Sequence, residues 1–110
     1  MAILKFYNEI TTEEEKQLNR WCMGTDGVCF KDIDEFVGSM DADDNKIDIR
    51  IHCVGGSVHE GWAIYDKLRA SGKEISCTVE GKCASMATVI LLSAPKERRK
   101  ALQNAKFCVH

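Results

Sequence analysis

Residues 46–57 read KIDIRIHCVGGS, and this stretch decides the fold. Isoleucines at positions 47, 49 and 51 alternate with polar residues at 48, 50 and 52, which is typical of a β-strand. The glycines at 55 and 56 interrupt the strand, and Ser57 has the side chain to cap a following helix. The stretch therefore predicts a strand that turns tightly into a helix.

The sequence on either side continues this alternation of strands and helices. Thr12 and Glu15 have the spacing of a capping box, Gly81 marks a loop, and Pro95 ends the last helix. The predicted strands cover Ile3–Tyr7, Lys46–Cys53, Glu74–Val79, Arg98–Leu102 and Ala105–Val109, and the predicted helices run from Thr12 to Cys22, Phe30 to Met40, Ser57 to Ser71 and Ala84 to Ser93. This order implies parallel strands joined by right-handed crossovers, so the predicted fold class is α/β.

Composition narrows the classes of function. The chain has 110 residues, which suits a single domain, and a formal charge of -2 with one short basic cluster at 96–100. We therefore expect no nucleic-acid partner. The sequence shows no signal peptide and no apolar run long enough to span a membrane, so a cytoplasmic location and no membrane partner are expected.

The six cysteines do not indicate a metal or disulfide framework. They lie at positions 22, 29, 53, 77, 83 and 108, with no Cys-x-x-Cys pair and no matching Cys/His cluster. We expect all six thiols to be reduced in a cytosolic chain. The sequence predicts no metal and no cofactor.

Three features carry possible chemistry. The Gly55–Gly56 pair can bring backbone N–H groups close to a ligand, although such a pair between a strand and a helix is more often just a tight turn. Ser85 falls in the first turn of a predicted apolar helix, where the N–H groups stabilise a developing oxyanion, although a serine there is more often only a cap. His110 follows a strand and acts as a base only if Ser85 is within reach.

Taken together, these features resemble the ClpP family of serine peptidases, most closely its phage and prophage branch of head maturation proteases. The resemblance covers about Ile47 to His110. It rests on four motifs in order: CVGGS at 53–57, GWAIYD at 61–66, ASM at 84–86 and NAKFCVH at 104–110. It implies a ClpP/crotonase-like spiral of β-β-α units, with a mainly parallel sheet covered by helices.

The resemblance also implies a role for each matching residue. Ser85 would be the nucleophile and His110 the general base, with the backbone N–H groups of Gly56 and Met86 as the oxyanion hole. The backbone of Gly55, Ser57 and Val58 would bind an extended peptide. The implied partners are peptide or protein substrates, among them phage capsid proteins, and further copies of the chain in a homo-oligomer.

The sequence departs from the family pattern in three places, of which the third bears most on activity. Val54 replaces the usual proline of the turn, and Ala87–Thr88 replaces a glycine-containing stretch. The family's acidic triad residue lies beyond His110, and neither Asp66 nor Glu80 has the register to replace it. The chain is thus expected to be a single domain over 1–110 that lacks the part carrying the acid, and a very weak enzyme at best.

The leading interpretation is an ATP-independent serine endopeptidase domain that matures phage heads, located in the bacterial cytoplasm or the prohead. Two alternatives remain open. One is a crotonase-like enzyme acting on acyl-CoA thioesters, which shares the spiral fold. The other is a catalytically inactive ClpP-fold module that serves assembly. Only the peptidase interpretation requires the Ser85 hydroxyl.

Overall fold

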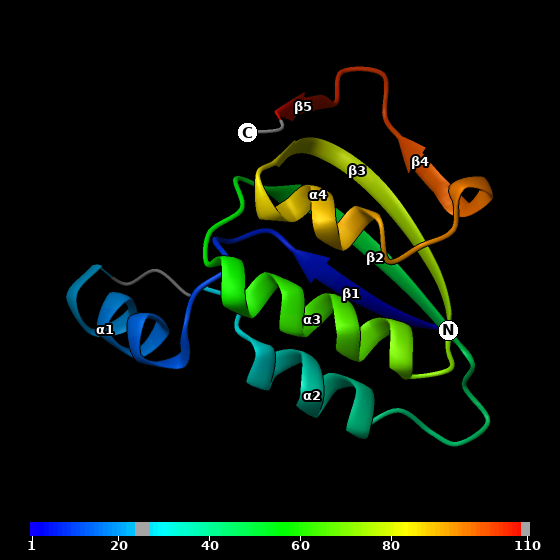
Figure 1. Ribbon diagram of the computed structural model, residues 1–110, viewed down its shortest axis with the longest axis horizontal. Helices are drawn as coiled ribbons and strands as arrows, with labels where there is room; N and C mark the ends of the chain where they lie inside the picture. Colours follow the sequence, from blue (N-terminus) through cyan, green and yellow to red (C-terminus); the bar gives the residue numbers. More distant parts are fainter. Residues whose placement is uncertain (24–26, 109–110) are drawn as a thin grey trace.

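The computed structural model describes residues 1–23 and 27–108 of the chain (Figure 1). Its strands are β1 (Ala2–Phe6), β2 (Lys46–Cys53), β3 (Glu74–Ala84), β4 (Arg99–Ala101) and β5 (Lys106–Cys108). Its helices are α1 (Glu13–Met23), α2 (Phe30–Gly38), α3 (Val58–Ala70) and α4 (Met86–Leu91), with a 3-10 turn η1 at Lys96–Arg98.

The strands form one parallel sheet in the order β1-β2-β3-β4, and β5 also pairs with β3. Figure 1 shows α2, α3 and α4 covering one face of this sheet, with α1 to one side. The predicted α/β class with parallel strands is therefore confirmed. Strands β4 and β5 do not pair with each other; each takes a different part of the same edge of β3.

The core lies between the sheet and the helices that cover it. The three isoleucines of β2 are almost completely buried, as their alternation predicts. They pack with a larger apolar cluster that includes Phe6, Ile33, Ile64, Leu68, Val79 and Ile90. Burial of such side chains contributes about 1.5–3 kcal/mol each, so this cluster is the main source of stability.

Local capping signals place two of the helices. The Thr12 hydroxyl accepts the Glu15 N–H at 3.1 Å just before α1, and the Ser57 hydroxyl accepts the Glu60 N–H at 3.3 Å in the first turn of α3. These bonds satisfy N–H groups that have no partner within the helix. The predicted starts of both helices are thus confirmed.

The boundary between β3 and α4 differs from the prediction. Gly81 lies inside β3 rather than in a loop, because the register with β2 slips there: Ile51 pairs with Val79, but Cys53 pairs with Cys83. The extra residues form an irregularity in which the His52 ring packs over Gly81, and a Cβ on Gly81 would collide with that ring. A glycine therefore continues the strand here instead of breaking it.

As a consequence, α4 is shorter than predicted. Ala84 ends the strand, Ser85 is the N-cap, and the helix begins only at Met86. The apolar composition of this stretch does not distinguish a buried strand end from a buried helix start. Near the C-terminus, the predicted strands shorten to β4 and β5, and Val109 lies outside the described residues.

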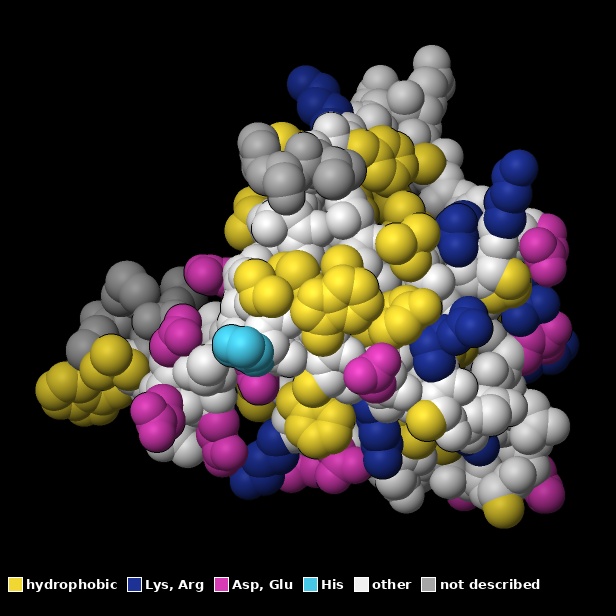
Figure 2. Space-filling model, in the orientation of Figure 1, with side chains coloured by type: hydrophobic (Ala, Val, Ile, Leu, Met, Phe, Trp, Pro, Cys, Tyr) yellow, Lys and Arg dark blue, Asp and Glu magenta, His cyan; other side chains and the backbone are white. Residues whose placement is uncertain are grey.

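The helical face of the molecule carries exposed apolar side chains. Figure 2 shows hydrophobic side chains gathered over α3 and α4. Val58, Trp62 and Leu92 are among the exposed large hydrophobic residues, and the Trp62 ring meets the Tyr65 ring edge-to-face at 5.6 Å. In the described part of the chain, no helix is long and apolar enough to cross a membrane.

Candidate active site

Ser85 stands at the junction of β3 and α4 with an unusual backbone. Its φ is 52° and its ψ is -123°, and among the described residues it is the only one other than glycine with a positive φ. Residues other than glycine avoid this region because their Cβ conflicts sterically with the backbone, and adopting it costs on the order of 1–3 kcal/mol. Such strain persists only where the surrounding structure enforces it.

Hydrogen bonds on both sides hold Ser85 in this conformation. Its N–H donates to the carbonyl of Cys108 in β5 at 2.8 Å. Its carbonyl accepts the Thr88 N–H at 3.0 Å and the Thr88 hydroxyl at 2.6 Å. The Ser85 side chain makes no capping hydrogen bond to the helix. The residue is therefore fixed by its backbone while its hydroxyl is left out of the cap.

The glycine turn after β2 lies directly against Ser85. Gly55 has a φ of 99° and Gly56 a φ of 138°, conformations that suit glycine. A Cβ on Gly55 would lie 2.8 Å from the Ser85 Cβ and 2.9 Å from the Met86 nitrogen. The structure thus brings together two predicted site elements, the glycine turn and the start of α4.

The Met86 N–H is at the first position of α4, where helix N–H groups have no partner within the helix. It lies on the side of the helix that faces the glycine turn, since a Cβ on Gly55 would touch its nitrogen. The Met86 side chain packs against Gly61 in α3, where a larger residue would collide with it. This packing fixes the helix start relative to α3.

One edge of the glycine turn is already occupied by the chain itself. The Ile10 N–H donates to the Gly55 carbonyl at 2.7 Å, and the Ser57 N–H donates to the Ile10 carbonyl at 2.8 Å. A Cβ on Gly56 would collide with that Ile10 carbonyl. The Gly55 carbonyl and the Ser57 N–H on this edge are therefore already paired. Val58, at the start of α3, is exposed.

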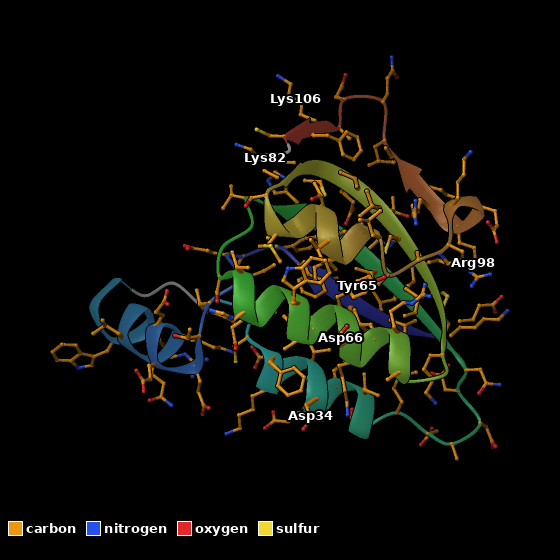
Figure 3. All side chains as sticks on the ribbon, in the orientation of Figure 1. Asp34, Tyr65, Asp66, Lys82, Arg98 and Lys106 are labelled. Atoms are coloured by element: carbon orange, nitrogen blue, oxygen red, sulfur yellow. The ribbon has the colours of Figure 1, made fainter. Side chains whose placement is uncertain are left out.

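The remaining residues considered in the sequence are placed as follows. His110 lies outside the described residues. Asp66 is exposed on α3 (Figure 3), and Glu80 accepts a hydrogen bond from the Tyr7 hydroxyl, which raises the Tyr7 pKa. These contacts give neither acid a link to Ser85. No group of His, Cys, Asp and Glu within the described ranges has the arrangement to hold a metal ion.

Two buried cysteines that the sequence patterns did not single out lie next to the glycine turn and to Ser85. Cys53 and Cys83 are buried register partners in β2 and β3, just before the two site elements. Burial raises the pKa of both thiols, and the nearby Cys53 adds to the effect on Cys83, whose pKa is about 11. The thiols are therefore neutral near pH 7. The buried cysteines at positions 29, 53, 77 and 83 are free thiols. The one signal in the sequence was the position of Cys53, two residues before the glycine pair, from which a contact with the turn could have been predicted.

Comparison with known protein families shows which family this chain belongs to. A family model described as Clp protease matches residues 35–110. This chain belongs to the Clp protease family. The match includes the glycine turn, the strained serine and the strand that binds its backbone.

Curated relatives in the Clp protease family are proteolytic subunits. The ATP-dependent Clp protease proteolytic subunit of Deinococcus radiodurans is 36% identical over 67 residues, which are 61% of this chain and 33% of the relative. The corresponding subunit of Porphyromonas gingivalis is 37% identical over 70 residues, 63% of this chain and 32% of the relative. The matched part spans about a third of these relatives.

Solved Clp protease structures share the fold. The ClpP protease catalytic domain of Plasmodium falciparum superposes with a TM-score of 0.74 at 29% identity, covering 99% of this chain and 55% of that one. A ClpP1 N165D mutant from Listeria monocytogenes gives a TM-score of 0.78 at 24% identity, covering 99% and 56%. The predicted ClpP-like arrangement of a mainly parallel sheet and covering helices is therefore confirmed.

Proposed function

We propose that this chain is the catalytic part of a ClpP-type serine endopeptidase, with Ser85 as the nucleophile. The observation that carries the proposal is the positive φ of Ser85 at the N-terminus of α4, in contact with the glycine turn. A strained, non-glycine residue whose hydroxyl is excluded from the helix cap is costly for structure alone. Strain of this kind concentrates at active sites, where it presents a reactive group.

The proposed oxyanion hole consists of the N–H groups of Gly56 and Met86. Both belong to segments in contact with Ser85, and the start of a helix favours developing negative charge. In this mechanism the Ser85 Oγ attacks the scissile carbonyl, and the carbonyl oxygen becomes negative between the two donors. The peptide would bind in extended form beside Gly55–Val58, on the edge that Ile10 leaves free.

His110 is the proposed general base. It follows Cys108, whose carbonyl accepts the Ser85 N–H, by two residues in the sequence. It would take the Ser85 proton during attack and return it to the leaving amine, giving an acyl-enzyme that water then hydrolyses. The family resemblance places the acidic residue that would orient the imidazole beyond His110, and losing such an acid lowers the activity of a Ser-His-Asp triad by orders of magnitude.

A narrower proposal concerns the biological role: ATP-independent maturation of phage heads, with capsid proteins as substrates and a homo-oligomer as the active form. Its support is the motif resemblance to the phage branch, and the exposed apolar side chains on α3 and α4 give copies of the chain a surface to share. Cleavage of a capsid precursor without ATP would support this role. A strict need for an ATP-driven unfolding partner would contradict it.

The test of the proposed function is labelling with a fluorophosphonate, followed by intact-protein mass. We expect one adduct on the parent chain, none on Ser85→Ala, and an unchanged adduct on Ser71→Ala, which alters a serine at the far end of α3. Labelling of Ser85→Ala would refute the assignment of the nucleophile. If the parent chain is unlabelled, the same test on a chain extended past His110 separates a missing acid from an inactive module.

A further inference from the structure

Cys53 makes two hydrogen bonds at the base of the glycine turn. It is the last residue of β2 and is almost completely buried. Its thiol donates to the Asn8 carbonyl at 3.2 Å, and its sulfur accepts the Gly55 N–H at 3.3 Å. The Gly55 carbonyl lies further from the sulfur, at 3.9 Å. One side chain therefore contacts both the turn and a segment far away in the sequence.

That distant segment, residues 8–11, is called here the strap. Its third residue, Ile10, forms backbone hydrogen bonds with both Gly55 and Ser57. The strap is bonded on its other side as well: the Val28 N–H donates to the Glu9 carbonyl and the Thr11 N–H to the Val28 carbonyl, each at 2.8 Å. The strap thus lies between the 27–28 segment and the glycine turn.

The chemistry of the thiol suits this double contact. Burial is the main cause that raises the pKa of Cys53, and the charge of Glu9 adds to it. The proton therefore stays on the sulfur at neutral pH and is available for the Asn8 carbonyl. The lone pairs of the same sulfur remain available for the Gly55 N–H. An ionised thiolate would lose the first bond.

We infer that Cys53 is a positioning residue, whose thiol locks the strap to the Gly55–Gly56 turn and so holds this turn in place beside Ser85. This rests on the proposed function only as far as the Gly56 N–H serves as an oxyanion donor. The mechanical part, locking of the turn by the thiol, stands on the contacts alone. Cys53 does not touch substrate and takes no part in the chemistry.

The inference predicts different effects for two substitutions. Cys53→Ala removes the partner of the buried Gly55 N–H, which is costly, and also removes the part-buried bond to the Asn8 carbonyl. Cys53→Ser keeps a donor and an acceptor in the same place, so it is expected to restore most of what alanine removes. Cys77→Ala is the matched control, because Cys77 is a fully buried strand cysteine whose thiol faces the Ile90 carbonyl instead of the turn.

The experiment measures amide hydrogen exchange at Ile10 and Ser57 in the whole chain, together with the rate of fluorophosphonate labelling at Ser85. In Cys53→Ala we expect exchange at both amides to rise about tenfold relative to Cys77→Ala, and labelling to slow by a similar factor. Cys53→Ser is expected to lie within about threefold of the parent in both measurements.

The two measurements separate the two proposals. Equal exchange at Ile10 and Ser57 in Cys53→Ala and Cys77→Ala would overturn the inference, whatever the labelling shows. Faster exchange without any labelling, in the parent chain and in the chain extended past His110, would support the role of Cys53 and count against the proposed function. Faster exchange with an unchanged labelling rate would overturn the link from the turn to the oxyanion hole.

Discussion

Gly55 and Ser85 approach each other so closely that a Cβ on Gly55 would lie 2.8 Å from the Ser85 Cβ. Real Cβ atoms do not approach to this distance, so the contact requires a glycine. Gly55 follows β2 and Ser85 follows β3, so the two residues meet where the carboxyl ends of these parallel strands lie side by side. Ligand sites of α/β sheets form at this edge.

Gly55→Ala is therefore expected to be severe. The new Cβ would collide with backbone and side-chain atoms of 84–86 and would force a φ of 99° on an alanine. We expect the free energy of unfolding to fall by about 2–4 kcal/mol and fluorophosphonate labelling to be lost. Gly72→Ala is the control, because Gly72 also has a positive φ but no atom within 4 Å of its Cβ position. Urea unfolding is expected to show a loss of only about 1 kcal/mol there. Equal losses would contradict the steric argument.

Ser85→Gly is expected to abolish fluorophosphonate labelling and to relieve the backbone strain at position 85. Glycine adopts a φ of 52° without steric conflict, whereas Ser85→Ala keeps both the Cβ and the strain. We expect the glycine variant to be more stable than the alanine variant by about 1 kcal/mol, with both unable to form the adduct. Thermal unfolding of the two variants measures the difference. A glycine variant less stable than alanine would show that the backbone of Ser85 is not strained.

The sequence predicted those parts of the fold that depend on local pattern. The alternation over 46–53 predicted β2 with its observed bounds, and the hydroxyls of Thr12 and Ser57 predicted two helix starts. The end of β3 was missed, because Gly81 has a strand role that only its contact with His52 explains. Contacts between distant segments, such as the strap against the turn, leave no periodic signal.

The candidate site was predicted in part. The motifs indicated that the glycine turn and Ser85 belong to one site, and the structure puts them in contact. The catalytic roles stay predictions for Ser85, Met86, Gly56 and His110. A role is tested only by measuring the reaction, and His110 lies outside the described residues. No pattern in the sequence indicated that Ile10 fills one edge of the turn. That bond joins residues 10 and 55, which no local pattern connects.

Glu60 is expected to stabilise the contact between α2 and α3. Its carboxylate accepts the Phe30 N–H at 3.0 Å, one of the N–H groups at the start of α2. Glu60→Ala leaves that N–H without its partner and is expected to cost about 1–2 kcal/mol. Glu60→Gln keeps an acceptor oxygen and is expected to cost less than half of this. Urea unfolding of both variants tests the bond, and equal losses would mean that charge rather than the hydrogen bond matters.

Alkaline pH is expected to destabilise the protein through its buried thiols. Burial raises the pKa of Cys77 from 9.0 to about 12, so the folded chain keeps this proton while the unfolded chain loses it above pH 9. The unfolded state then binds fewer protons, and stability falls as pH rises from about 9 towards 12, by at most about 1.4 kcal/mol per pH unit for one thiol. Below pH 9 the contribution is complete. Cys77→Ala removes this group, so urea unfolding between pH 8 and pH 10.5 is expected to show a shallower decline in the variant than in the parent. Parallel declines would mean that Cys77 does not retain its proton in the folded state.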